Sequence, residues 1–549
     1  MTSSRLPDMT WYSRFSRSGV VSLLYLALFF LVAVSPVLLM SGNSFRADGS
    51  WSTSHYTFLT QSRWLALFFR SVMLSLSATL IAGLIGVPLA FFLARFTFPG
   101  KRLASFLYLA PLFIPPHIHT LAWLYLYGDK GVVNSLLMSA GVAVLPVFTF
   151  SGNTGVALIL AFSYFPLITL LTLVGLAGID RNLEESAGFV RTPWTIVRVI
   201  TLPLVSPYIF SALLIVFIFS FFNYGVPALL RVPTCPVEIF SRFSAFYDEA
   251  GAAAMSMPAV VIVVCAFLGL RIWSKKKQFT MQLAGSRTTR PTPVTGLSKI
   301  FLTGFITLML AAGVVLPVAS LFLQAGSLAS FIMAARGSLR EFRTTLLVSA
   351  GSASCITLFA FCLGRIIDNL SGTRQAVAEF LTFLPFAFPA TTLGIGLIYL
   401  WNSRMTGFLY TSTAMLLLAM TARFLPLAIH IIRSSLKQVH PGLLEAASFG
   451  RTSRLQRWLF IDFPLARRGL AACWILAFVF CTGELGTTLL VIPPGSGTVS
   501  LKIYNLLHYG AGPLVAALAL LLLGINFTVF LGLAKIPLEI FGRGPLCRN

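Results

Sequence analysis

Long apolar runs separated by short polar loops dominate the pattern along this chain. About twelve runs contain roughly the 20 apolar residues that a helix needs to cross the ~30 Å hydrocarbon core of a bilayer. Backbone polar groups in lipid must bond within their own segment, so we expect helices rather than strands. The predicted spans are 20–40, 72–92, 103–126, 154–176, 207–230 and 252–270, followed by 300–323, 346–364, 380–401, 411–432, 469–492 and 512–533.

The apolar pattern repeats, which divides the chain nearly in half. A Pro-x-x-x-Pro pattern at 111–115 recurs at 385–389, and the apolar-apolar-Pro-Leu pattern at 164–167 recurs at 424–427. We therefore predict a first half over 1–273, a polar linker over 274–299 and a second half over 300–549. The fold class is an all-α polytopic membrane protein, with two parallel six-helix repeats related by a pseudo-two-fold axis along the membrane normal.

Composition supports this interpretation and excludes a soluble domain. Hydrophobic residues make up 57% of the chain and charged residues only 10%, too few to cover a water-exposed surface. The 40 basic residues outnumber the 16 acidic ones, but they cluster in short loops between apolar runs. That distribution is the positive-inside pattern rather than a nucleic-acid-binding surface, and it predicts that both termini are cytoplasmic. The first apolar run is longer than the core of a signal peptide, so we expect an anchor helix.

Two basic loops contain the same short motif, over 181–203 and over 440–464. The first copy reads Leu183-Glu184-Glu185-Ser186-Ala187 and ends at Pro203, and the second reads Leu444-Glu445-Ala446-Ala447, continues through Gly450 and ends at Pro464. Both follow the fourth predicted span of their half and precede the fifth. The motif resembles the EAA loop of ABC-importer permeases, on which a separate ATPase subunit docks.

The resemblance implies a short surface helix-turn-helix in each loop. Small residues after the glutamate would let a partner approach the backbone, and the proline would begin the next span, where a missing N–H costs least. The first copy departs from the family, because it lacks the turn glycine and is one residue short between Glu185 and Pro203. We expect Asp462, within the second loop, to be solvated or to face the partner. The implied ATPase-docking residues are Glu185, Ser186, Ala187, Arg191, Pro203, Glu445, Ala446, Ala447, Gly450 and Pro464.

The resemblance also implies partners. The chain has no Gly-x-x-x-x-Gly-Lys-Ser/Thr loop, so ATP would be bound by two copies of a separate ATPase, and a solute-binding protein would deliver the substrate. The segments 223–227, 483–486, 492–495 and 503–510 are most similar to fused ferric-iron-type permeases of the bacterial inner membrane. Thiamine, phosphonate, polyamine and sulfate permeases have similar layouts and remain alternatives. We predict no catalytic, cofactor or metal site, and the expected mechanism is alternating access.

Polar residues inside apolar spans are costly and therefore informative. Asn223, Tyr224 and Glu484 stand at matching places near the ends of the fifth and eleventh predicted spans, and we predict that they line the translocation path. A buried structural hydrogen bond is the alternative for Asn223 and Glu484. For Arg423, in the tenth span, we expect a partner on another helix rather than the substrate.

A metal site and a secondary transporter are two alternatives to this interpretation of the sequence. His117 and His119 form a His-x-His pattern, but residues two apart on a helix face different sides, so we do not expect a metal site. A twelve-span secondary transporter also uses parallel six-span repeats. It would need several charged residues near the middle of the membrane and has no use for a duplicated docking loop.

Overall fold

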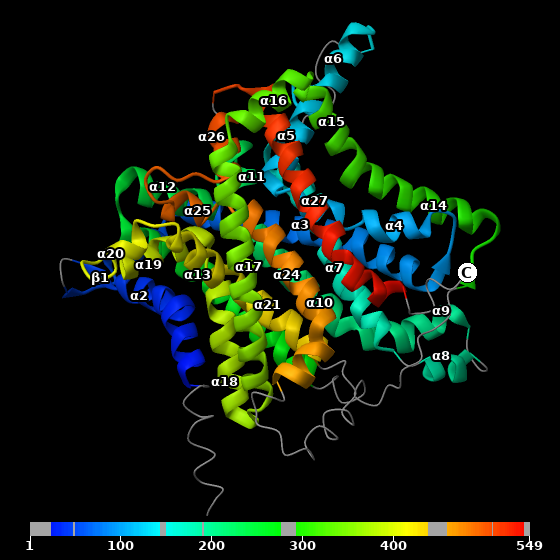
Figure 1. Ribbon diagram of the computed structural model, residues 1–549, viewed down its shortest axis with the longest axis horizontal. Coiled ribbons are helices and arrows are strands. Elements are labelled where there is room, and N and C mark those ends of the chain that lie inside the picture. Colours follow the sequence, from blue (N-terminus) through cyan, green and yellow to red (C-terminus); the bar gives the residue numbers. More distant parts are fainter. Residues whose placement is uncertain are drawn as a thin grey trace, which may run out of the picture.

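The computed structural model describes residues 23–47, 50–142, 150–179, 181–188, 192–275, 292–436, 458–507 and 509–542. Helices make up almost all of it, and the all-α polytopic membrane fold is confirmed (Figure 1). Within the described ranges, ten helices are long and apolar enough to cross a membrane. The ten are Leu23–Asn43, Ser62–Arg95, Gly152–Ala177, Trp194–Leu229, Glu249–Ser274, Gly296–Ala325, Leu339–Asp368, Ala414–Leu436, Phe460–Gly483 and Gly512–Leu533.

The other two predicted spans are not single straight helices. The span predicted at 103–126 is α4 (Lys101–Leu107), η3 (Ala110–Phe113) and α5 (Pro116–Tyr127). The span predicted at 380–401 is α18 (Gly372–Phe383) and η7 (Leu384–Ala387), bent by 101° from α19 (Ala390–Trp401). Both breaks fall within the Pro-x-x-x-Pro pattern. The second proline takes an extended ψ of 143° at Pro115 and 145° at Pro389, and a new helix begins directly after it.

Three long helices pack together in the same way in each half. In the first half, α3 (Ser62–Arg95), α7 (Gly152–Ala177) and α10 (Leu202–Phe221) pack against one another. In the second half, α17 (Leu339–Asp368), α21 (Ala414–Leu436) and α24 (Phe463–Gly483) do the same. Their buried faces form one continuous core with the neighbouring helices, while many leucines on α3 and α17, such as Leu80, Leu84 and Leu347, are exposed. Exposed leucines of this number fit a surface that faces lipid rather than water.

The first helix of each half packs on the opposite half. The segment formed by η1 (Phe30–Val34) and α2 (Ser35–Asn43) lies against α19 and α21 of the second half. The segment formed by η6 (Ala311–Val315) and α15 (Leu316–Ala325), which continues α14 (Gly296–Leu310), lies against α5 and α7 of the first half. The contact with α19 is close, because a side-chain carbon at Gly396 would lie 2.8 Å from Met40 Cγ. The two halves are therefore interleaved.

A half-buried ionic network adds a polar link between the halves. Arg433 on α21 contacts Asp368 at 2.7 Å and Glu379 at 2.9 Å, and Arg271 contacts the other oxygen of Glu379 at 2.7 Å. Arg271 lies on α13 (Glu249–Lys275) of the first half, whereas the other three residues belong to the second. Glu379 therefore holds two arginines from different halves.

Within the described ranges, four long helices contain a π-helical segment that ends two residues before a proline. These are η1 before Pro36, η4 (Val197–Thr201) before Pro203, η6 before Pro317 and η8 (Trp458–Asp462) before Pro464. Proline lacks an N–H, and its ring clashes with the carbonyl four residues earlier, which the wider π turn relieves. Each segment occurs at the same place in both halves.

Short helices cover the two ends of the molecule (Figure 1). One end carries α6 (Val132–Ser139), α16 (Leu328–Arg336) and α26 (Val499–Leu507), with α12 (Cys235–Phe246) nearby, and the other carries α8 (Arg181–Gly188), α9 (Pro193–Ile196) and α18. Other short helices are α11 (Gly225–Leu229), α20 (Gly407–Tyr410), α25 (Thr488–Val491) and η2 (Ser54–Thr60). The strand pairs are short: β1 (Arg46–Ala47) with β2 (Ser50–Trp51) antiparallel, and β3 (Phe96–Thr97) with β4 (Thr292–Pro293) parallel.

Candidate functional site

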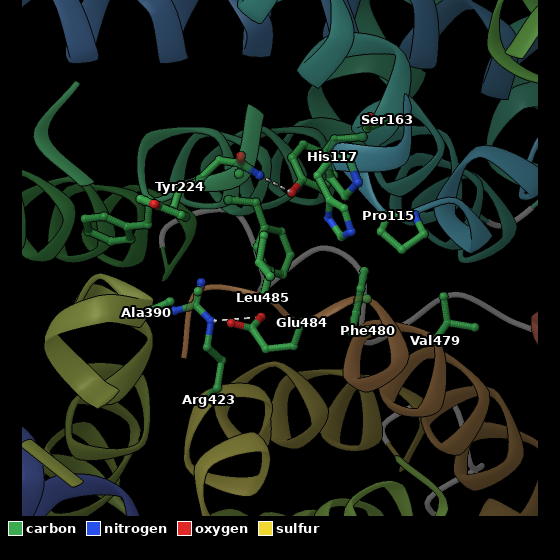
Figure 2. A pocket seen from close by; sticks show the side chains of 18 of the residues that line it. Pro115, His117, Ser163, Tyr224, Ala390, Arg423, Val479, Phe480, Glu484 and Leu485 are labelled. Carbon is green, nitrogen blue, oxygen red and sulfur yellow. Dashed lines mark hydrogen bonds and ion pairs between the residues drawn. The ribbon is translucent and has the colours of Figure 1, made fainter. Parts of the chain in front are cut away.

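A cavity lies between the two halves, at the breaks in both proline-containing spans and at the ends of α10 and α24. Its walls leave about 90 Å³ for the centres of water molecules, which is room for several waters. Figure 2 shows His117 and Tyr224 on one side of this space and Arg423 with Glu484 on the other. The polar side chains that line it are His117, Ser163, Tyr164, Asn223, Tyr224, Arg423 and Glu484.

Asn223 and Glu484 occupy equivalent positions and make equivalent backbone bonds. Each follows the end of a long helix, where the chain turns before a short helix begins. Asn223 Oδ1 accepts the Val226 N–H at 3.0 Å, and Glu484 Oε1 accepts the Thr487 N–H at 2.9 Å. Both side chains therefore satisfy an otherwise unpaired amide at the start of α11 or α25. The turns also bring the halves together, since a side-chain carbon at Gly225 would lie 3.3 Å from Leu485 Cδ2.

The second partner of each residue distinguishes the two halves. Asn223 Nδ2 donates to the Tyr164 hydroxyl at 3.3 Å, which makes a neutral pair with α7. Glu484 Oε2 lies 3.5 Å from Arg423 Nε, which makes an ion pair with α21, and both side chains are at most 10% exposed. The partner expected for Arg423 on another segment is therefore Glu484. The cavity is therefore neutral on the side of one half and ionic on the side of the other.

Aromatic rings close the cavity toward the α8 end. Tyr164 stacks on Phe219 with ring centroids 5.5 Å apart, Phe219 meets Phe480 at 5.4 Å, and Phe480 stacks on Phe424 at 5.7 Å. This four-ring stack takes two rings from α7 and α10 and two from α21 and α24. It crosses the boundary between the halves.

A second cluster closes the cavity on the other side. Tyr224, Leu485 and Tyr504 form a buried apolar group, and the hydroxyls of Tyr224 and Tyr504 are 3.0 Å apart. Tyr504 lies on α26, whose Lys502 is anchored to Glu341 at the start of α17 by a 2.8 Å ion pair. The cavity thus lies between this tyrosine cluster and the four-ring stack.

The two histidines do not act together. His117 lines the cavity, and its Nε2 has no hydrogen-bond partner. His119 faces away, with its Nε2 3.2 Å from the Pro111 carbonyl oxygen. In the described part of the chain, no three His, Cys, Asp or Glu residues are grouped so that they could hold a metal ion.

The structure describes only part of the predicted docking loops. In the first loop, Glu185 and Ser186 are exposed on α8, Ala187 is half-buried, and Pro203 is the second residue of α10. Pro464 is likewise the second residue of α24. Arg191 of the first loop lies outside the described residues, as do Glu445, Ala446, Ala447 and Gly450 of the second.

Two ion pairs fasten these loops to the ends of long helices, and sequence reasoning missed both. Glu184 Oε1 accepts from Arg95 Nη2 at 2.5 Å and from the Thr201 hydroxyl at 2.7 Å. In the second half, Asp462 pairs with Arg365. The expectation that Asp462 is solvated or faces a partner is wrong, because its side chain is 2% exposed.

The correspondence between residues of the two loops also differs from the one that the motif first indicated. Pro203 follows Glu184 by the same number of residues as Pro464 follows Glu445. Glu184 is therefore the equivalent of Glu445, and the first loop is not one residue short. This equal spacing was the signal in the sequence that could have identified Glu184.

No family model matches the chain, whereas individual known proteins are similar to it. It is 25% identical over 475 residues to the Fe(3+)-transport system permease protein FbpB 2 of Haemophilus influenzae, covering 84% of this chain and 88% of that protein. It is 29% identical over 282 residues to a probable sulfate transport system permease protein of Chlorokybus atmophyticus, covering 48% of this chain and 93% of that protein. A crystal structure of a bacterial alginate ABC transporter aligns with a TM-score of 0.42 at 18% identity, covering 49% of this chain and 99% of that one.

Proposed function

We propose that this chain, a homologue of the permease subunits of ABC importers, forms the complete translocation pathway of one importer. The observation that carries the proposal is the cavity between the halves, lined by residues of both. It lies where helices break in both halves, and substrate sites of transporters built from repeats are formed at such breaks. Asn223, Tyr224 and Glu484 all line it, in support of the path predicted for them.

Alternating access follows from the two closures of the cavity. Separation of the tyrosine cluster would open the cavity toward α26, and separation of the four-ring stack would open it toward α8. Each closure contains residues from both halves, so rocking of one half against the other opens one side while the other stays shut. Transport needs both movements in sequence.

ATP would drive these movements through partner subunits. Two copies of an ABC ATPase would dock on α8 and on the equivalent loop of the second half, and a solute-binding protein would dock at the end with α6, α16 and α26. We place the chain in the bacterial inner membrane with both termini and the docking loops cytoplasmic. The excess of cations in the loops on that side supports this orientation.

Ferric iron is the first substrate to test, because the similarity to the ferric permease extends over most of both chains. Sulfate is the second candidate, since nearly the full length of a probable sulfate permease matches about half of this chain. Thiamine, phosphonate and polyamines remain further alternatives from the sequence resemblance.

The test is substrate uptake in cells that contain the intact transport system, with the chain present, deleted, or altered by Glu185→Ala plus Glu445→Ala. We expect uptake of ⁵⁵Fe to require the chain and to fall at least tenfold in the double variant, with unchanged protein in the membrane. The exposed Arg374 supplies a control, since Arg374→Ala leaves both loops intact. Uptake that persists in the double variant would contradict ATPase docking, and proton- or sodium-driven uptake by the chain alone would indicate a secondary transporter.

A further inference from the structure

The carboxylate and amide oxygens that line the cavity are already engaged. Glu484 uses Oε1 for the Thr487 N–H, and its Oε2 faces Arg423 at 3.5 Å. Asn223 uses Oδ1 for the Val226 N–H. The Tyr164 hydroxyl oxygen accepts from Asn223 at 3.3 Å. A metal cation needs several free oxygen, nitrogen or sulfur ligands, and this wall does not supply them.

Hydrogen-bond donors around the same cavity, in contrast, lack acceptors. A guanidinium carries five N–H groups, but Glu484 is the only described partner of Arg423, and the Arg423 Nε has no hydrogen bond within normal distance. Its side chain is 8% exposed and points into the cavity (Figure 2). Tyr164 keeps its own O–H after accepting from Asn223. His117 Nε2, which donates in one of the two imidazole tautomers, is buried without a partner.

We propose that this cavity binds its cargo as an anion, with oxyanion oxygens that accept hydrogen bonds from Arg423, Tyr164 and His117. The inference rests on the proposed transport function and narrows its substrate class. Buried donors without acceptors are costly, and anionic oxygens satisfy several of them at once. The same oxygens could belong to a free oxyanion, such as sulfate or molybdate, or to the anionic ligands that surround a ferric ion.

Glu484 has a defined role in this site. In the empty cavity it is the counter-charge that keeps the buried guanidinium of Arg423 paired. An anionic cargo must compete with it for the same N–H groups. Glu484 therefore weakens binding and favours release, as a transport pathway requires.

The test exploits opposite expectations for two single substitutions. The full-length chain in lipid nanodiscs is titrated with ³⁵S-sulfate, with ⁹⁹Mo-molybdate and with ⁵⁵Fe(III)-citrate. We expect Arg423→Gln to weaken binding at least tenfold and Glu484→Gln to tighten it several-fold, because the competitor is removed. A cation site requires the reverse order. Arg374→Gln is the matched control, because Arg374 is an exposed arginine away from the cavity and its loss leaves binding unchanged.

A double variant distinguishes a loss of binding from misfolding. Arg423→Gln with Glu484→Gln removes both charges, so no unpaired charge stays buried, and it binds as weakly as Arg423→Gln alone. Arg423-dependent binding of sulfate or molybdate supports a free oxyanion, and Arg423-dependent binding of iron only as the citrate complex supports an anionic ferric cargo. No binding by the unaltered chain, or the reverse order of the single variants, overturns the inference.

Cellular uptake separates this inference from the proposed function. If uptake requires the chain but the variants follow the order of a cation site, the permease function stands and the anion site fails. If the purified chain binds anions in the expected order while uptake does not need it, the anion site stands and the permease function fails.

Discussion

Buried ion pairs connect the ends of helices in this protein at a few well-defined residues. Arg95 with Glu184 and Arg365 with Asp462 occur where the predicted docking loops meet α3 and α17. Removing water from two charges costs several kcal/mol, so such pairs add little net stability. Removal of one partner, however, leaves the other charge buried. The two ion pairs therefore act mainly on position, because each holds one loop to the end of one long helix.

Arg365→Ala tests this constraint. Asp462 would lose its cation while its side chain remains buried, so we expect the free energy of unfolding to fall by about 3–5 kcal/mol. Thermal unfolding of the purified chain in detergent measures the change. The variant Arg365→Ala with Asp462→Thr should recover most of the loss, because it removes both charges and places at 462 the residue type found at the matching Thr201. A fall no larger than that of the exposed control Arg374→Ala would argue against a buried pair.

At the scale of residues, the sequence predicted correctly where a polar side chain differs in character from the apolar residues around it. Asn223 and Glu484 were identified because polar atoms are conspicuous next to apolar spans, and the cavity confirms that they face the same space. Tyr164 and His117 were not placed there, since an aromatic or a lone His in an apolar run is usually a core residue. Asp462 was misjudged because its burial depends on Arg365, nearly a hundred residues away in the chain.

At the scale of elements, proline determines where the helices change form. It breaks both spans that enter the cavity wall and lies just after each of the four π-helical segments. The sequence pattern predicted the repeat of the Pro-x-x-x-Pro pattern, but it predicted one continuous span at each of 103–126 and 380–401. A count of apolar residues cannot detect a bend of 101°, because the bent pair is as apolar as a straight span.

The contact of α2 with α19 supplies a prediction at this scale. Gly396→Ala would place a methyl group 2.8 Å from Met40 Cγ and against the Pro36 carbonyl, so the two helices must separate. We expect a loss of about 1–3 kcal/mol in the free energy of unfolding, as is usual for overpacked sites. Thermal unfolding again measures it. The control is Gly304→Ala, because a side-chain carbon at Gly304 meets no other atom within 4 Å. Equal stability of the two variants would contradict close packing at Gly396.

For the whole molecule, the interleaved first helices decide whether a half can exist alone. The α2 helix of the first half packs on α19 of the second half, and α15 of the second half packs on α5 of the first half. We therefore expect that the fragments 1–283 and 284–549 are each unstable when expressed singly, but co-purify and restore uptake when expressed together. Size-exclusion chromatography of the tagged fragments checks this. A single fragment that purifies as a stable, monodisperse protein would contradict the interleaving, and failure of the pair would contradict the predicted linker over 274–299.

The interleaving also sets a delay during synthesis. The α2 helix leaves the ribosome roughly 350 residues before α19, its main partner. At about 5–20 residues per second, α2 waits on the order of 20–70 s in the membrane with the Met40 face uncovered. During that time, membrane insertases and proteases can reach it. If the halves were separate polypeptides, each would also have to find the other by diffusion in the bilayer. Joining them in one chain limits the wait to the time of translation and fixes their ratio at one to one.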